Sequence, residues 1–176
     1  GRKPEGMWLP ETAVDPESLD ILAEHGILFT ILAPHQAKAV RAIGEAVWND
    51  VSGSRVDPSM PYRVKLESGR TIAIFFYDGP ISRGVAFERL LHKGEYLADR
   101  LIGAFSATRK RPQLVHIATD GETYGHHHRR GDMALAYALD YIEGNDLAKL
   151  TNYGEFLALA PPTHEVQAAM SRCTMR

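Results

Sequence analysis

The chain has 176 residues, of which 44% are hydrophobic and 24% charged, with a formal net charge of -2 and a pI of about 6.5. These values are typical of one globular domain, and they give no reason to expect nucleic acid or a membrane as a partner. No apolar run approaches the roughly 20 residues that cross a bilayer, and no signal peptide is visible. The single cysteine, Cys173, excludes an internal disulfide and indicates a reducing compartment, so we expect a cytoplasmic protein.

Three elements are predicted in the first 32 residues. Trp8-Leu9-Pro10-Glu11 is typical of the end of a buried strand. Asp15-Pro16-Glu17 predicts the start of a helix, because Asp is a good N-cap, proline fits the first helical position and Glu favours the first turn. Gly26 is placed to end that helix. The almost continuously apolar run 27–32 then favours a strand buried on both faces, as in a parallel sheet.

Five further helices are predicted along the chain. In the first of them Val40, Ile43 and Val47 would share one side. Their ranges are 37–48, 83–92, 94–106, 131–142 and 153–159.

Residues 49–80 are interpreted as a loop and a β-hairpin inserted in a single domain that spans residues 1–176. The loop is rich in Ser, Gly, Pro and Asp, and the two strands of the hairpin flank Ser68-Gly69-Arg70. Another strand is expected at 114–118, where Leu114-Val115-His116-Ile117-Ala118 is mainly apolar. Strands that alternate with helices indicate an α/β fold.

Polar side chains follow the predicted strands at four places. In chain order they are Glu11, His35, Asp78, and Asp120 with Glu122. An Asp-Gly pair after one strand is usually a simple turn. The ends of parallel strands, however, meet at one face, where α/β enzymes keep their active sites, so the repetition favours a catalytic face. Asp15 is the better helix cap, which leaves Glu11 for a functional role.

The histidines at 126–128 allow several interpretations. Three consecutive imidazoles cannot all face one ion, but His126 and His128 could share a side and form a metal site with Asp120 or Glu122. Alternatively they donate hydrogen bonds to ligand hydroxyls, or they lie in solvent beside Arg129 and Arg130. We favour the ligand-binding role and expect no metal or other cofactor.

Two segments resemble conserved regions of glycoside hydrolase family 57. Residues 6–15 with Phe29-Thr30-Ile31-Leu32-Ala33-Pro34 resemble the third region, and Thr119-Asp120-Gly121-Glu122-Thr123-Tyr124-Gly125-His126 resembles the fourth. The likeness runs through most of residues 6–165 and is greatest to an α-amylase/α-mannosidase-like subgroup. The resemblance implies a retaining enzyme that acts on α-glucans. It also implies an α/β fold that is part of an incomplete (β/α)7 TIM-like barrel.

The resemblance also implies roles for particular residues. Glu11 matches the nucleophile and Asp120 the general acid/base of a double displacement. Glu122, Tyr124 and His126 match the surroundings of the acid. With the polar residues at the other strand ends, and with Trp8 as a ring that could either stack on a sugar or pack in the core, the predicted substrate-binding set is Trp8, His35, Asp78, Glu122, Tyr124, His126 and His128.

The expected partner is an oligosaccharide or polysaccharide. The first two conserved regions of the family would precede Gly6 and the fifth is not recognisable after Glu165, so the resemblance implies the middle of a catalytic domain. Open sheet edges then predict self-association into a homo-oligomer. Two alternatives are a metal-dependent carbohydrate enzyme that uses Asp120, His126 and His128, and a non-catalytic sugar-binding module.

Overall fold

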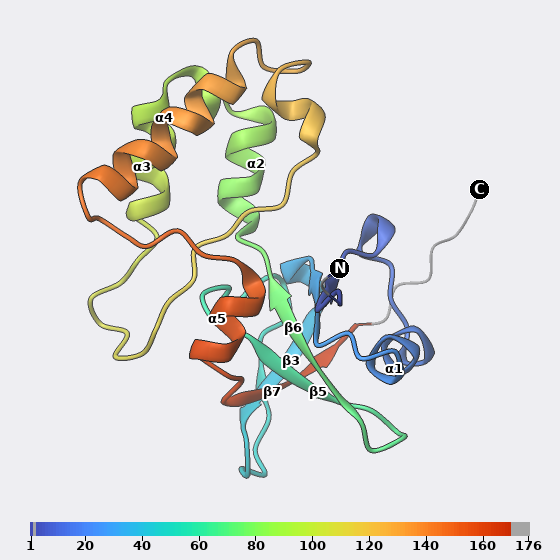
Figure 1. Ribbon diagram of the computed structural model, residues 1–176. Helices are drawn as coiled ribbons and strands as arrows, with labels where there is room; N and C mark the ends of the chain where they lie inside the picture. Colours follow the sequence, from blue (N-terminus) through green and yellow to red (C-terminus); the bar gives the residue numbers. More distant parts are fainter. Residues whose placement is uncertain (2, 170–176) are drawn as a thin grey trace. The chain divides into compact units, whose positions relative to one another are not determined.

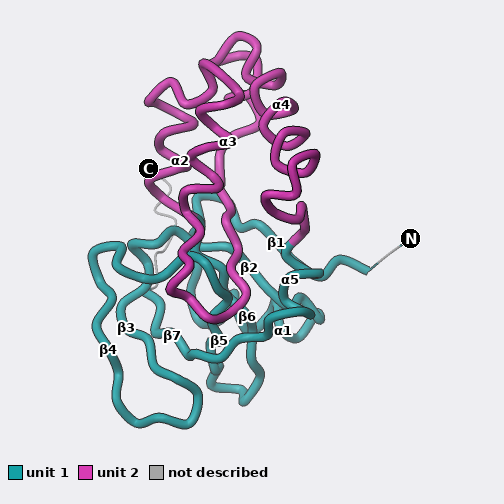
Figure 2. Tube along the Cα trace, turned by 90° about the vertical axis from the view of Figure 1, so that its left-hand side faces the viewer, with its two compact units in different colours: residues 1–77, 153–176 teal, residues 78–152 magenta. Residues whose placement is uncertain are grey.

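The computed structural model describes residues 1 and 3–169, which form two compact units (Figure 1). Unit 1 combines residues 1–77 with the chain from Tyr153 onward, and unit 2 comprises Asp78–Asn152 (Figure 2). Cys173 lies outside the described residues. Within the described part, none of the helices has both the length and the apolar character needed to cross a membrane.

Unit 1 is built on a seven-stranded mixed sheet with the strand order β1-β2-β6-β5-β7-β3-β4. The first three strands in this order are parallel, as expected for the buried runs. β5 is antiparallel to β6 and parallel to β7, whereas β3 is antiparallel to both β7 and β4. The strands are β1 (Gly6–Met7), β2 (Phe29–Leu32), β3 (Ala37–Ala42), β4 (Asn49–Asp50), β5 (Tyr62–Lys65), β6 (Thr71–Phe76) and β7 (His164–Ala168).

β6 is buried on both faces, which explains its continuous apolar sequence. Its residues Ile74 and Phe76 belong to the core cluster that also contains Leu19 of α1 (Pro16–Glu24). Phe75 points to the opposite face, where its ring lies 4.9 Å from that of Tyr153 in α5 (Tyr153–Leu159). Burial raises the pKa of Tyr153 to about 12.

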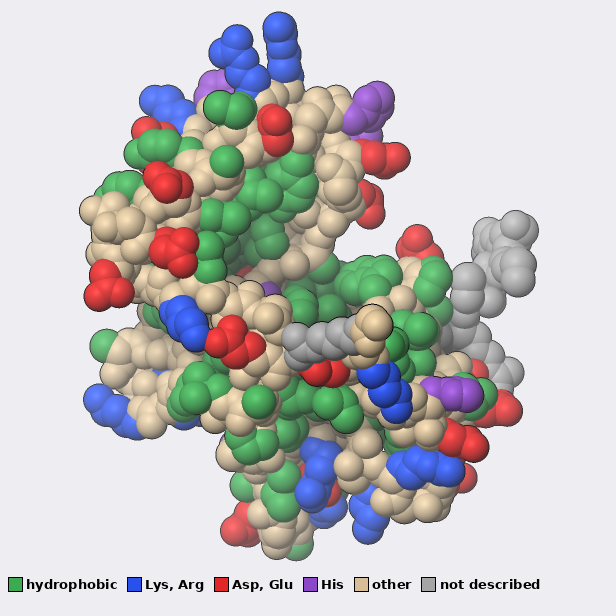
Figure 3. Space-filling model, in the orientation of Figure 1, with side chains coloured by type: hydrophobic (Ala, Val, Ile, Leu, Met, Phe, Trp, Pro, Cys, Tyr) green, Lys and Arg blue, Asp and Glu red, His purple; other side chains and the backbone are tan. Residues whose placement is uncertain are grey.

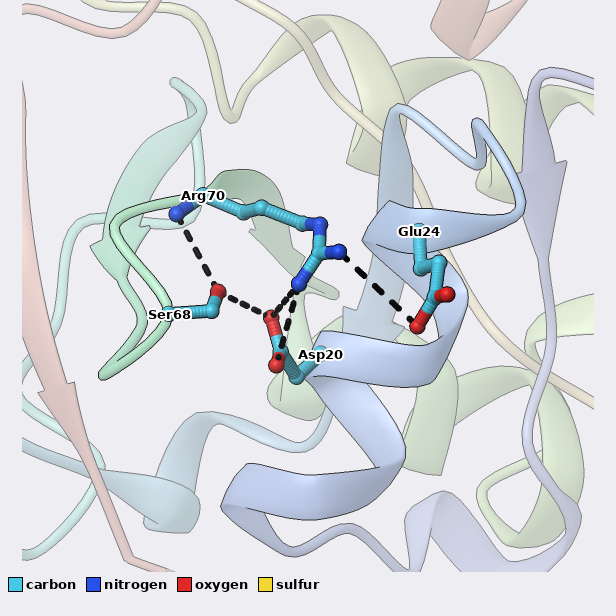
Figure 4. A network of polar contacts seen from close by, with 4 residues as sticks. All are labelled: Asp20, Glu24, Ser68 and Arg70. Atoms are coloured by element: carbon cyan, nitrogen blue, oxygen red, sulfur yellow. Dashed lines mark hydrogen bonds and ion pairs between the residues drawn. The ribbon is translucent and has the colours of Figure 1, made fainter.

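The predicted start and end of α1 are confirmed. The side chain of Asp15 accepts a hydrogen bond from the Ser18 N–H at 2.7 Å, and Gly26 follows the helix with a φ of +79°. Asp20 of α1 also accepts a hydrogen bond from Ser68, and the Arg70 guanidinium lies 3.3 Å from the same carboxylate (Figure 4). This exposed network connects α1 with the turn between β5 and β6.

The hairpin of β5 and β6 is confirmed, but the helix predicted over 37–48 is wrong. That segment forms β3, which ends at Ala42 and leads into a turn where Gly44 has a φ of +95°. β3 pairs with β7, which lies more than 120 residues later in the sequence, so local periodicity could not reveal the pairing. The apolar side that the helix would have buried does not form, since Val47 is 71% exposed.

Unit 2 is a small helical unit. Two of its helices, α3 (Gly94–Ile102) and α4 (Gly131–Gly144), lie close to their predicted ranges, whereas α2 (Gly79–Phe87) begins four residues and ends five residues earlier than the predicted 83–92. The strand predicted at 114–118 is wrong, because this segment forms no strand pairing in the described chain. Its apolar side chains Val115 and Ile117 pack against the helical core instead.

Charged groups of both signs are interspersed on the face drawn in Figure 3, and the described residues of that face show no extended basic patch. This distribution is consistent with the formal net charge of -2.

Candidate active site

Glu11 lies on a strained turn that follows β1. Glu11 has a φ of 56° and a ψ of 18°, and Thr12 has a φ of 50°. The Ala13 N–H donates to the Pro10 carbonyl at 3.0 Å and closes the turn. Glu11 and Thr12 are its two central residues, and both have positive φ, in the left-handed region. For L-residues this region is sparsely populated, and each such residue costs on the order of 1–3 kcal/mol unless it is glycine. The turn therefore persists only because neighbouring structure holds it.

Two buried side chains make hydrogen bonds from β2 and from the 3-10 turn that follows it: Thr30 bonds to the end of β1, and Gln36 bonds to the Glu11 turn. The Thr30 hydroxyl donates to the Met7 carbonyl at 2.8 Å. The Gln36 side chain is 2% exposed; its Nε2 donates to the Thr12 carbonyl at 2.8 Å, and its Oε1 accepts from the Ala33 N–H at 2.8 Å. Gln36 thus fixes the backbone at the residue next to Glu11.

Trp8, Glu11 and His35 belong to unit 1 and follow two adjacent parallel strands. Trp8 is 49% exposed, so it is not a core residue, and the side chains of Glu11 and His35 are exposed as well. β1 and β2 leave the sheet in the same direction, which places the segments after them at one edge. The aromatic ring and the carboxylate are therefore accessible to a ligand in this unit.

Asp120 lies in unit 2, at the start of a 3-10 turn formed by Gly121–Tyr124. Its carbonyl accepts from the Thr123 N–H at 3.0 Å, while its carboxylate is exposed and makes no capping bond to the turn. Glu122 is exposed in the same turn. The carboxylate of Asp120 is thus not used to cap the turn, as an ordinary Asp in this position would be.

The segment that leads to Asp120 is attached to the start of α2. The Asp78 N–H donates to the His116 carbonyl at 3.0 Å, and the Ala118 N–H donates to the Ser82 hydroxyl oxygen at 3.1 Å. The Ser82 hydroxyl in turn donates to the Asp78 carbonyl at 2.7 Å. Asp78 itself caps α2, since its carboxylate accepts from the Ile81 N–H at 2.8 Å.

The histidines after Asp120 differ in their surroundings. The His126 and His127 side chains are exposed, and their backbone N–H groups both donate to the Glu122 carbonyl. The Nε2 of His128 lies 2.9 Å from the Ala86 carbonyl of α2, and because a carbonyl only accepts, that nitrogen carries a proton. His128 therefore anchors the histidine segment to α2.

Tyr124 is half-buried against the helical core of unit 2, and its hydroxyl accepts a hydrogen bond from Thr119 at 3.0 Å. Among the described residues, no group of three or more His, Cys, Asp or Glu side chains is arranged to hold a metal ion.

The two predicted catalytic acids belong to different units, Glu11 to unit 1 and Asp120 to unit 2. Each unit gathers its own predicted residues, and the pairing of the two acids stays a prediction. The sequence interpretation missed Gln36 and Ser82, which hold the segments that carry the acids. A signal for Gln36 was present, because Gln at the third helical position often bonds back to the N-cap backbone.

The chain matches the model of glycosyl hydrolase family 57 over residues 1–169. This match covers nearly the whole chain, so the protein belongs to glycosyl hydrolase family 57. The family predicted from the two motifs is therefore confirmed. None of the curated proteins matches the chain.

Two solved structures have a similar fold. A 4-alpha-glucanotransferase from Thermococcus litoralis shares 21% identity with a TM-score of 0.68, over 94% of this chain and 24% of that enzyme. An exo-type maltose-forming amylase from Pyrococcus sp. ST04 shares 18% identity with a TM-score of 0.63, over 87% of this chain and 24% of that enzyme. The α/β class is confirmed, and a match to about a quarter of each larger enzyme agrees with part of a TIM-like barrel.

Proposed function

We propose that the protein is a retaining glycoside hydrolase or transglycosidase that acts on α-linked glucans by double displacement. Glu11 attacks the anomeric carbon while Asp120 gives its proton to the leaving oxygen. Asp120 then removes a proton from water or from an acceptor sugar hydroxyl, which releases the glycosyl group from Glu11. The mechanism requires the two carboxyl groups to act about 5–5.5 Å apart.

The observation that carries this proposal is the exposed carboxylate of Glu11 on a strained turn. Strained backbone of this kind concentrates at active sites, where a required side-chain position outweighs its cost. Membership of glycosyl hydrolase family 57 supports the reaction class. The names of the two structural neighbours, a glucanotransferase and an amylase, support α-glucans as the substrate class.

The remaining predicted residues divide by their surroundings into two groups. Trp8, His35, Glu122 and His126 are exposed, which supports direct contact with sugar, with the Trp8 ring stacking on an apolar sugar face. Asp78, Tyr124 and His128 make hydrogen bonds to their own unit, which supports a role in shaping the site. A cytoplasmic location, supported by the single cysteine, completes the proposal.

The proposal is tested with α-maltosyl fluoride, because fluoride leaves without protonation. Asp120→Ala should still form the glycosyl-enzyme, so that added azide restores turnover and gives an α-glycosyl azide. Glu11→Ala should lose on the order of 10⁴-fold in kcat, and azide should give the β-azide by direct displacement. The stereochemistry of each azide product, measured by NMR, assigns the two roles separately.

A parent protein without turnover on maltooligosaccharides or glycogen would contradict the enzyme proposal. If that parent, Glu11→Gln and Asp120→Asn all bound maltooligosaccharides equally well by calorimetry, the sugar-binding alternative would replace it. Products that carry the same azide stereochemistry in both variants would contradict the assigned roles.

A further inference from the structure

We propose that Gln36 is the positioning residue of Glu11: its buried amide holds the left-handed turn that presents the Glu11 carboxylate. The inference rests on the proposed role of Glu11 as nucleophile. Gln36 itself acts through the backbone, since its hydrogen bond goes to the Thr12 carbonyl and not to the carboxylate.

The turn needs an external support because its own bonds do not favour it. The N–H groups of Thr12 and Ala13 close it at 3.0 Å, but Glu11 and Thr12 both have positive φ and neither is glycine. Thr12 is also β-branched, which makes the left-handed region less favourable still. Relaxation of either residue toward negative φ would turn the Glu11 side chain in a different direction.

The Gln36 amide is fixed at both of its ends. Its Oε1 accepts from the Ala33 N–H, so its Nε2 must face the Thr12 carbonyl, and each contact is 2.8 Å. A flipped amide would place donor against donor and acceptor against acceptor in a buried position. Only a side chain with one donor and one acceptor at this spacing satisfies both partners, which Glu or Ala cannot do.

The position of Gln36 in the chain makes this support rigid. Gln36 ends the 3-10 turn Pro34–Gln36 directly after β2, and β2 lies between β1 and β6 in the sheet. The amide thus ties the Glu11 turn to a strand that is paired on both sides. Thr30, in the same strand, offers a matched comparison, because its buried hydroxyl makes a bond of equal length to Met7 instead.

The test compares Gln36→Glu, Gln36→Ala and the control Thr30→Val in the full chain. Amide hydrogen exchange of Thr12 and Ala13 is measured by NMR, and kcat and KM are measured with α-maltosyl fluoride. Both Gln36 variants should speed exchange at Thr12 and Ala13 by about fivefold or more, as expected for one lost hydrogen bond. They should lower kcat about 10- to 100-fold with little change in KM, because a misplaced nucleophile slows the chemical step.

Thr30→Val should change the exchange of the amides around Met7 and leave kcat within about threefold of the parent. Unchanged exchange at Thr12 and Ala13 in both Gln36 variants would overturn the inference, and so would faster exchange with unchanged kcat. An equal loss of kcat in Thr30→Val would also overturn it, because general loosening of the sheet would then explain the effect. If hydrogen exchange changed as expected but Asp120→Ala formed no α-glycosyl azide, the result would instead contradict the proposed role of Glu11 as nucleophile.

Discussion

Glu165 of β7 is a buried carboxylate between two guanidinium groups. Its Oε2 accepts from the Arg41 Nε and its Oε1 accepts from the Arg63 guanidinium, both at 2.8 Å. The hydrogen bond from Arg63, which has the larger effect, and the hydrogen bond from Arg41 hold the pKa of Glu165 below its ordinary value of 4.5. The three side chains connect β7 with its neighbours β3 and β5. A neutral residue in place of Glu165 would leave the two guanidinium groups without their negative partner.

The ion pairs of Glu165 with Arg41 and Arg63 predict that the stability of the protein depends on pH. A lowered pKa in the folded state means that the contribution of Glu165 is complete above pH 4.5 and is lost as the pH falls through the lowered value. Glu165→Gln should therefore lower the free energy of unfolding by about 1–3 kcal/mol at pH 7, with a smaller difference at acidic pH. Urea denaturation at pH 7 and at pH 3 measures both values.

Glu67→Gln is the control, because Glu67 is exposed in the turn of the β5–β6 hairpin. We expect it to change the unfolding free energy by less than about 0.5 kcal/mol at either pH. A Glu165→Gln protein whose deficit persisted unchanged at pH 3 would show that packing, and not the charge of Glu165, is responsible.

At the scale of elements, α3 and α4 pack closely through a glycine. A Cβ placed on Gly94, at the start of α3, would collide with the ring and the Cβ of Tyr137 in α4. Gly94 is buried, and the adjacent Leu97 and Ala98 belong to the core of unit 2. The approach of the two helices thus depends on the absence of a side chain at this position.

Gly94→Ala should destabilise unit 2 by about 1–3 kcal/mol, because the collision forces Tyr137 or the helix to move. Gly144→Ala is the matched control, since a Cβ on Gly144 at the end of α4 meets no atom within 4 Å. The control should be neutral or slightly stabilising, because Ala has the higher helix propensity. Thermal unfolding followed by circular dichroism distinguishes them, and equal melting temperatures would contradict the packing argument.

At the scale of the whole molecule, unit 1 is assembled from two distant parts of the chain. β7 lies between β5 and β3 in the sheet, and α5 supplies Tyr153 and Phe156, whose rings pack against Phe75. Unit 2 is encoded by the continuous segment between these parts. At the two ends of the strand order, β1 and β4 are edge strands, and self-association through such edges stays a prediction.

A chain that ends at Asn152 lacks α5 and β7, so β3 and β5 should each lose their pairing with β7. We expect the amides of β3 and β5 to lose protection in hydrogen exchange, while those of α3 and α4 stay protected, because their core lies within unit 2. A chain that ends at Ala169 keeps α5 and β7 and is the control, in which the amides of β3 should stay protected. Loss of protection throughout α3 and α4 would contradict the expectation that the core of unit 2 is sufficient to protect them.

Local sequence was sufficient wherever neighbouring residues decide the structure. The Asp15 cap, the β5–β6 hairpin and the helices of 94–102, 131–144 and 153–159 follow from capping, turn and periodicity signals that act over a few residues. The error at 37–48 has the opposite cause, because β3 is defined by its distant partner β7. The error at 114–118 arose because this apolar segment packs against the helical core of unit 2 and not in a sheet.

For the candidate site, two short motifs in the sequence were sufficient to predict the family, which the match over residues 1–169 confirms, while the catalytic roles of the two carboxylates stay a prediction. The sequence could not reveal that Glu11 stands on a left-handed turn, or that Gln36 and Ser82 hold the segments on which Glu11 and Asp120 depend. Backbone conformation and hydrogen bonds between segments far apart in the chain are properties of packing. Only the tertiary structure decided them, because the groups that satisfy each buried donor are brought together by the fold.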